Sequence, residues 1–143
     1  MQAVTEWRPP YAYVPGQTDR HSEDLFDRFE FGLDAIETSD RWQLALAFMH
    51  EGFFWEAHEL FEPIWMSLPN GSADRALVQG LIQLANAGLK QRMGRNNAVA
   101  RLSDLAKDLL QTALTGQRKA IPGMTREDVC RLWEVMPIDD YAL

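Results

Sequence analysis

Apolar side chains recur at intervals of three and four residues along most of this chain, which is the spacing of one face of an α-helix. The first series follows Ser22, a residue type that favours the N-cap, and predicts a helix over residues 23–37. Its apolar members are Leu25, Phe29, Leu33 and Ile36. Nowhere do apolar and polar residues alternate as in a half-buried strand, so the pattern predicts an all-α fold.

Five more helices are predicted after this one, each bounded by residues that commonly begin or end a helix. Their approximate ranges are 39–52, 53–65, 73–94, 97–116 and 126–136. Gly52, Gly94 and Gly116 end three of them, because glycine readily takes the left-handed conformation that follows a helix. Thr125 with Asp128 forms a capping-box pattern before the last. The sequence therefore predicts an irregular bundle of five to six helices in which the third and fourth are central.

The first 21 residues have a different composition, in which aromatic residues alternate with residues that break helices. The breakers are Pro9, Pro10, Pro15 and Gly16, and the aromatic residues are Trp7, Tyr11 and Tyr13. Because disordered tails contain few aromatic residues, we expect an extended N-terminal arm that these rings anchor across the third and fourth helices. The predicted organisation is one helical domain over 1–143, with the arm (1–21), a helical core (22–116) and a turn with a short C-terminal helix (117–143).

Composition and charge narrow the classes of function. The chain has 143 residues, 46% of them apolar and 24% charged, as expected of one globular domain. A formal net charge of -7 disfavours binding to nucleic acid or to anionic lipid. No apolar run approaches the roughly 20 residues that span a bilayer, and the first residues lack the pattern of a secretory signal. With Cys130 as its sole cysteine, the protein is predicted to be cytoplasmic and not a membrane protein.

The third predicted helix carries the most informative chemistry. His58, Glu62 and Trp65 lie at positions i, i+4 and i+7, so an imidazole, a carboxylate and an indole share one face. Glu59 lies beside Glu62 on the same helix. Because the segment is apolar nearly all round, we expect the cluster to be buried, where ionisable groups need partners. Pro63 removes one helical hydrogen bond, which predicts a bend or an early end of the helix at the cluster.

The fourth predicted helix offers a matching polar face. Opposite its leucine face, four residues follow one another at intervals of four, three and four: Gln79, Gln83, Asn86 and Lys90. The stripe contains no acid, whereas a stripe facing solvent usually mixes Glu and Lys. Its donors suit carboxylates, and its carbonyls can accept from an imidazole, so we expect it to pair with the third helix. In a buried network of this kind, alanine substitution of His58 or Glu62 is expected to cost about 2–4 kcal/mol.

The run Phe-Trp-Glu-Ala-His-Glu-Leu-Phe-Glu-Pro-Ile-Trp at residues 54–65, together with the amide stripe, resembles the domain of unknown function 309 family of small helical proteins. The resemblance covers about residues 42–110, and the segment around Arg20 and His21 resembles an N-terminal extension of part of that family. It implies polar positions at Glu56, His58, Glu59, Glu62, Gln79 and Gln83, with Trp65 as the aromatic residue. It implies a helical fold and a site, and no established activity.

These residues specify a metal site only in part. The segment from His58 to Glu62 reads H-E-x-x-E, whereas the zinc site of metalloproteases requires H-E-x-x-H. Lys90 and Gln91 stand where many members of the family have histidine, which weakens the case for a second metal ligand from the fourth helix. We predict no cofactor, and a divalent metal would require His21 to join His58 and Glu62.

Two functions fit the residues best. The first is a noncatalytic structural or interaction module, in which the polar network fixes packing and the surface binds a protein partner or a second copy. The second is a small-molecule- or metal-binding protein, with metal-dependent hydrolysis through His58, Glu59 and Glu62 as one form of it. The residues by themselves name no reaction. The complete predicted site comprises Arg20, His21, Glu56, His58, Glu59, Glu62, Trp65, Gln79, Gln83, Asn86 and Lys90.

Overall fold

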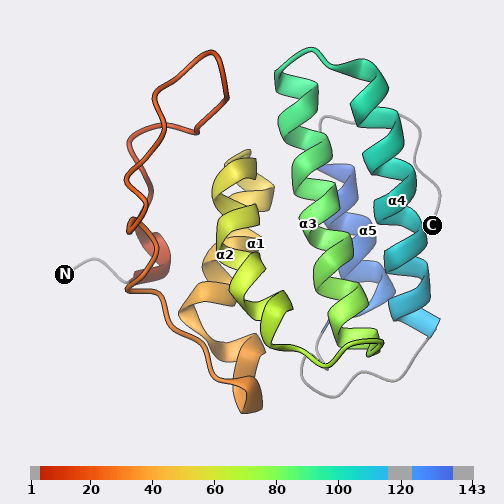
Figure 1. The fold of residues 1–143 in the computed structure, drawn as a ribbon. Helices are drawn as coiled ribbons and strands as arrows, with labels where there is room; N and C mark the ends of the chain where they lie inside the picture. Colours follow the sequence, from red (N-terminus) through yellow and green to blue (C-terminus); the bar gives the residue numbers. More distant parts are fainter. Residues whose placement is uncertain (1–3, 116–123, 137–143) are drawn as a thin grey trace.

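The computed structural model describes residues 4–115 and 124–136, and these ranges contain helices and no strand, as the sequence predicts. Their α-helices are α1 (Asp40–Glu51), α2 (Phe54–Ser67), α3 (Ala73–Arg92), α4 (Asn96–Thr115) and α5 (Arg126–Glu134). The 3-10 helices η1 (Val4–Glu6) and η2 (Leu33–Thr38) precede them. Figure 1 shows the chain passing from an N-terminal arm through α1 and α2 to the long α3 and α4. In the described part of the chain, no helix is long and apolar enough to cross a bilayer.

The ends of α1 and α2 follow the local signals in the sequence. Ser39 is the N-cap of α1, and its hydroxyl accepts a hydrogen bond from the backbone N–H of Trp42. Gly52 takes a left-handed φ of 86° after α1, which lets the chain turn and begin α2 at once. α2 runs through Pro63 to Ser67, so the early end that the proline suggested is wrong.

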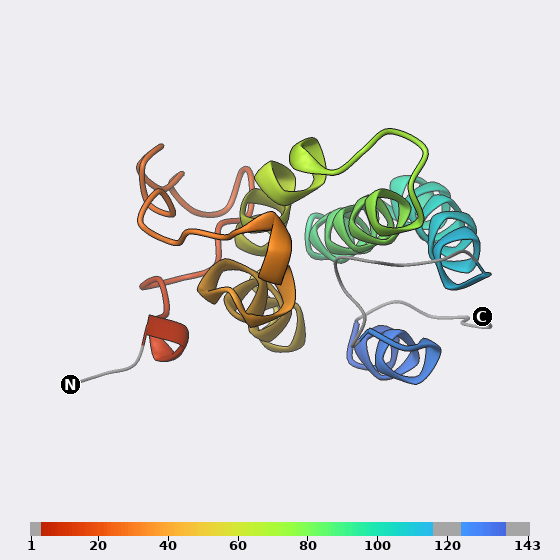
Figure 2. The same ribbon diagram turned by 90° about the horizontal axis from the view of Figure 1, so that it is seen from below.

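α3 and α4 form a long antiparallel pair, and α5 lies beside them (Figures 1 and 2). The pair packs closely at Gly80, where a Cβ atom would come within 2.8 Å of the Leu110 side chain. At the C-terminal end of α5, Met136 packs against Gly88 of α3, where a Cβ atom would again meet its neighbour at 2.8 Å. Small residues on α3 therefore bring two other elements against it.

The core lies where α2 meets α1 and α3, so the third and fourth helices expected from the sequence are central. Figure 2 shows the arm, η2 and α1 on one side of the molecule and α3, α4 and α5 on the other, with α2 beside both groups. The largest fully buried side chains of this core are Phe48 and Met49 of α1, Leu60, Phe61 and Ile64 of α2, and Leu77, Leu81 and Leu84 of α3.

The helix predicted over residues 23–37 is wrong. Residues 23–28 form turns, residues 29–32 have no regular structure, and the 3-10 helix η2 follows them. The reason is Arg41 of α1, whose buried guanidinium donates hydrogen bonds to the carbonyls of Phe26 and Phe29, at 2.8 and 2.6 Å. In an α-helix these carbonyls would accept from N–H groups four residues on. Burial lowers the pKa of the Arg41 guanidinium, and the backbone carbonyls that surround it replace part of its hydration.

The N-terminal arm is anchored by side chains, as expected, but it lies along α1 and α2 and not across α2 and α3 (Figure 1). Trp7 packs its ring 5.5–6.4 Å from three phenylalanine rings of the core. Arg8 donates two hydrogen bonds, of 2.7 and 2.6 Å, to the Glu51 carboxylate at the end of α1. The arm reaches α3 only near its C-terminus, where the Gln17 amide donates to the Arg92 carbonyl at 2.9 Å. The strongest attachment points are thus on α1 and α2.

Candidate functional site

α2 directs its ionisable side chains to three different places. Glu56 is completely buried and points to the N-terminal arm. His58 and Glu62 line a cavity that α2 shares with α3. Glu59 lines a separate open cavity on the outer side of α2. The sequence placed these residues in one site, whereas the structure divides them.

The cavity between α2 and α3, which we call the groove, has a volume of about 230 Å³. Its lining residues are His58, Glu62, Trp65, Gln79, Ile82, Gln83 and Asn86. The structure therefore brings the polar face of α2 together with three members of the amide stripe of α3. Lys90, the fourth member, does not line the groove.

The polar contacts in the groove run along each helix. His58 Nε2 lies 3.0 Å from Glu62 Oε2, one turn along α2. On α3 the Asn86 amide donates to Gln83 Oε1 at 3.3 Å. Within the described residues, no side-chain hydrogen bond crosses from the α2 wall of the groove to the α3 wall. The two faces are neighbours across a space and do not form the direct network that the sequence predicted.

The prediction that this cluster is buried is also wrong. The side chains of His58 and Glu62 are 26% and 42% exposed. The buried face of α2 consists of Phe54, Glu56, Ala57, Leu60, Phe61 and Ile64. Trp55 and Trp65, which made the helix look apolar all round, are only partly covered, because an indole can pack one edge against protein and leave the other in water.

Trp65 has an unusual environment at the wall of the groove. Its indole Nε1 is buried and has no acceptor among the residues that the structure describes. The Arg75 guanidinium lies 4.5 Å from the centre of its ring and is itself held by the Leu68 carbonyl at 2.7 Å. This stacked cation fixes the indole in place, so a buried donor is held at the groove without a partner.

A second cluster joins the arm to α2, and we call the residues His21, Tyr13, Trp55 and Glu56 the arm cluster. Glu56 Oε2 accepts from the backbone N–H of Tyr13 at 2.7 Å and lies 2.8 Å from His21 Nε2. Because an ionised carboxylate can only accept, Nε2 carries the proton when Glu56 is ionised. The side chains of His21 and Glu56 are 5% and 0% exposed, so this pair is removed from water.

Aromatic rings enclose the arm cluster. Tyr13 packs its ring edge-on against Trp55 at 5.0 Å, and the His21 ring lies 5.7 Å from Trp55. Arg20 lies over the same indole at 5.8 Å. Arg20 and His21, predicted as members of one site with His58, therefore belong to this second cluster. The pairing of His21 with the buried carboxylate was not predicted. The sequence nevertheless showed two signals for it: an aromatic arm that needs an anchor, and an acid on an apolar helix.

The structure does not bring together the three metal ligands predicted from the sequence. His21 pairs with Glu56, which lies about 200° around α2 from His58, so the three predicted ligands do not converge. Across residues 4–115 and 124–136, no group of three or more His, Cys, Asp and Glu side chains is placed to hold a metal ion. The Glu59 cavity, of about 340 Å³, has Glu62 as its other acid and no histidine in its lining. In the described residues the three predicted ligands His21, His58 and Glu62 therefore do not form one site.

The structure thus defines an all-α protein with an open polar groove between its two central helices. A family model described as "Domain of unknown function (DUF309)" matches residues 42–102, from the first turn of α1 into α4. Over this segment the chain is similar to that family, in agreement with the resemblance found in the sequence. The match includes every residue that lines the groove and excludes the arm with His21. Comparisons with curated proteins and with solved structures found no match.

Proposed function

We propose that this protein binds a small polar molecule in the groove between α2 and α3. The observation that supports this function is that polar groups from two helices line one cavity without bonding across it. The imidazole of His58 and the amides of Gln79 and Gln83 therefore face a shared space with donors and acceptors to spare. Convergent polar groups on a preformed cavity are typical of small-molecule sites.

The sequence favoured a structural or interaction module, and the structural form of this hypothesis requires a buried polar network. An exposed ion pair of one helical turn contributes only about 0.3–0.5 kcal/mol, because water screens it and the side chains lose freedom. The pair formed by His58 and Glu62 is of this exposed kind. His58 and Glu62 therefore contribute little to stability, and ligand binding accounts better for the placement of the polar groove residues.

Size and charge indicate the class of ligand. The groove has a volume of about 230 Å³, so we expect a small metabolite and not a polymer. The one carboxylate of the groove, Glu62, is paired with His58, and the α3 wall offers neutral amides. The buried Trp65 N–H calls for an acceptor. We therefore expect an uncharged molecule with carbonyl, amide or hydroxyl groups.

The proposal is one of binding, and it does not include metal-dependent hydrolysis. That alternative used Glu59 together with His58 and Glu62, and Glu59 does not line the groove. With His21 paired to Glu56, only His58 and Glu62 of the three predicted ligands line the groove.

The NMR signal of the Trp65 indole N–H supplies the test. Of the five tryptophans, Trp65 is the one that lines the groove. The full chain is titrated with uracil and, separately, with xylitol, which present carbonyl and hydroxyl groups. We expect at least one probe to move the Trp65 signal. Gln83→Leu should weaken that binding about fivefold, the effect of one hydrogen bond between neutral groups. Gln91→Leu, on an exposed residue of α3 outside the groove, should leave it unchanged.

Either of two results would overturn the proposed function. One is that neither probe moves the Trp65 signal. The other is that Gln83→Leu and Gln91→Leu have equal effects on binding, which would place the probe elsewhere on the protein.

A further inference from the structure

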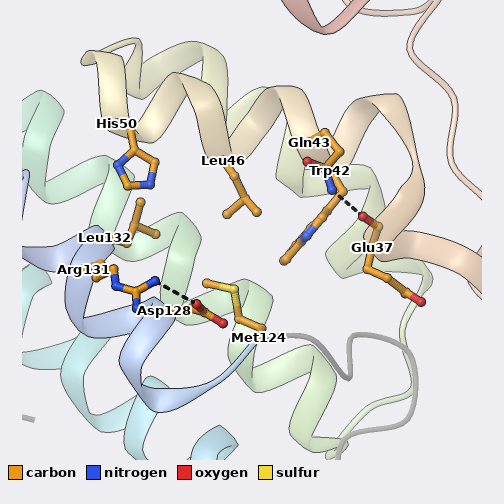
Figure 3. A pocket seen from close by; sticks show the side chains of 9 residues that line it. All are labelled: Glu37, Trp42, Gln43, Leu46, His50, Met124, Asp128, Arg131 and Leu132. Atoms are coloured by element: carbon orange, nitrogen blue, oxygen red, sulfur yellow. Dashed lines mark hydrogen bonds and ion pairs between the residues drawn. The ribbon is translucent and has the colours of Figure 1, made fainter.

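A second cavity lies between α1 and α5 and shares no residue with the groove. Its volume is about 310 Å³, which is at the lower end of the range for small-molecule pockets. Figure 3 shows side chains from α1 above it and from α5 and the residues before α5 below it. Neither the predicted site nor the proposed function uses this cavity.

The floor of the cavity is apolar. Trp42 and Leu46 point into it from α1, and Met124 and Leu132 face them from the other side (Figure 3). Trp42, Met124 and Leu132 are 2%, 6% and 1% exposed, so they form a firm surface backed by the core. Such a floor suits a flat or branched hydrocarbon body, whose burial contributes about 25 cal/mol for each Å² removed from water.

Basic side chains stand at one end of this floor. His50 of α1 and Arg131 of α5 lie on opposite sides of the cavity, both beside Leu132 (Figure 3). Glu127 holds Arg131 Nη2 at 2.6 Å, and Nη1 is 3.7 Å from Asp128 Oδ1, too far for a hydrogen bond. The guanidinium is therefore fixed in direction and keeps donors free for a ligand.

Of the two acids that line the cavity, Asp128 lies near Arg131 and Glu37 lies at the other end (Figure 3). Asp128 Oδ2 accepts from the Thr125 backbone and hydroxyl at 2.9 and 3.0 Å, in the capping box of α5. The Glu37 side chain points away from His50 and Arg131 in Figure 3, and its backbone carbonyl accepts from the Gln43 amide at 2.6 Å. An anion placed between the two basic groups would face donors on both sides, and it would compete with Asp128 Oδ1 for Arg131 Nη1.

We propose that this cavity binds an amphipathic carboxylate, with its apolar body on the floor and its carboxylate between His50 and Arg131. Arginine favours carboxylates because its planar guanidinium can donate two parallel hydrogen bonds. The imidazole of His50 supplies a further donor from the opposite side. The apolar body of such a molecule matches the floor of the cavity, and its carboxylate matches the basic end.

Calorimetric titration of the full chain with naphthalene-1-acetate and with its neutral amide tests this site, because the two compounds have the same apolar body. We expect the acetate to bind about tenfold more tightly, the effect of a charge-assisted hydrogen bond. Arg131→Gln should abolish the preference, and Arg131→Lys should keep part of it. Arg126→Gln, on an exposed residue of α5 that does not line the cavity, is the matched control and should change neither affinity.

Separate results would overturn this proposal. It fails if the acetate does not bind, if acetate and amide bind equally, or if naphthalene-1-methylamine binds more tightly than the acetate. It also fails if Arg131→Gln keeps the preference while circular dichroism shows α5 intact. Gln83→Leu in the groove should leave acetate binding unchanged, so failure of the groove and failure of this cavity are distinguishable.

Discussion

Two histidine–glutamate pairs, one between the arm and α2 and the other within α2, differ in their exposure to water. In the arm cluster the side chains of His21 and Glu56 are 5% and 0% exposed, whereas those of His58 and Glu62 in the groove are 26% and 42% exposed. The glutamate of the first pair and the histidine of the second are two residues apart in the sequence. The same two side-chain types therefore serve different ends on one helix.

The difference follows from what surrounds each pair. Removing an ion pair from water is costly unless other groups replace the lost hydration. At Glu56 the Tyr13 N–H and His21 Nε2 do so for Oε2, whereas Oε1 has no hydrogen-bond partner among the described residues. Breaking such a pair costs a large free energy, so the pair is suited to holding the arm permanently on α2. In the groove water reaches both partners, so either can exchange its neighbour for a ligand at little cost.

The largest expected effect is at the buried acid. Glu56→Ala leaves the His21 imidazole and the Tyr13 N–H buried without an acceptor, and we expect a loss of about 3–5 kcal/mol in the free energy of unfolding. Urea denaturation measures it. Glu59→Ala on the same helix is the control and should cost less than about 1 kcal/mol. A loss below about 1 kcal/mol for Glu56→Ala would show that the arm cluster does not hold the arm on α2.

Loss of the other partner should be smaller and should act on the arm. His21→Ala leaves the Glu56 carboxylate with the Tyr13 N–H, and we expect a cost of about 2 kcal/mol. Trypsin cleavage after Arg20 should become faster relative to the wild type, because the arm detaches more often. Arg95→Ala, in the exposed turn after α3, is a control that should leave cleavage after Arg20 unchanged. An unchanged rate in His21→Ala would contradict the anchoring role.

In the groove, by contrast, the effects on stability should be slight. The structure replaces the sequence-based expectation of about 2–4 kcal/mol for His58→Ala with a value below about 1 kcal/mol, since the pair is exposed. His58→Ala and Gln83→Ala should be additive within about 0.5 kcal/mol, because no hydrogen bond joins these residues. Denaturant midpoints of the two single variants and the double variant provide the measurement. A coupling above about 1 kcal/mol would restore the network that the sequence predicted.

The smallest effect is expected where the arm meets the end of α1. The hydrogen bond from Arg8 lowers the pKa of Glu51 below its usual value of 4.5. A carboxyl whose pKa is lowered by folding stabilises the protein above its unfolded pKa, and this contribution disappears as the pH falls through the folded pKa. Because Glu51 is 43% exposed, Glu51→Gln should cost less than about 0.5 kcal/mol at neutral pH. Thermal melts should show the difference vanishing in acid and shrinking in high salt, whereas a difference that grows in acid would reverse the assigned sign.

Local patterns in the sequence determined most of the helical framework. Ser39, Gly52 and the Thr125–Asp128 pair act within one turn of the chain, so their caps could be predicted without knowledge of the fold. The facing of α2 and α3 also followed, because an amphipathic helix must bury its apolar stripe and thereby orients its polar one. The cytoplasmic location and the lack of nucleic-acid binding stay predictions from composition.

The tertiary structure decided the rest, because it depends on groups that are distant in the sequence. Residues 23–37 have a helical pattern, yet Arg41 takes their carbonyls and holds them in turns. Likewise, Glu56 and His58 are two residues apart on one helix and have similar neighbours in the sequence. Glu56 alone is covered by the arm, which buries it. Periodicity reports the spacing of apolar side chains along one helix, whereas burial and ion pairing depend on which other segment covers them.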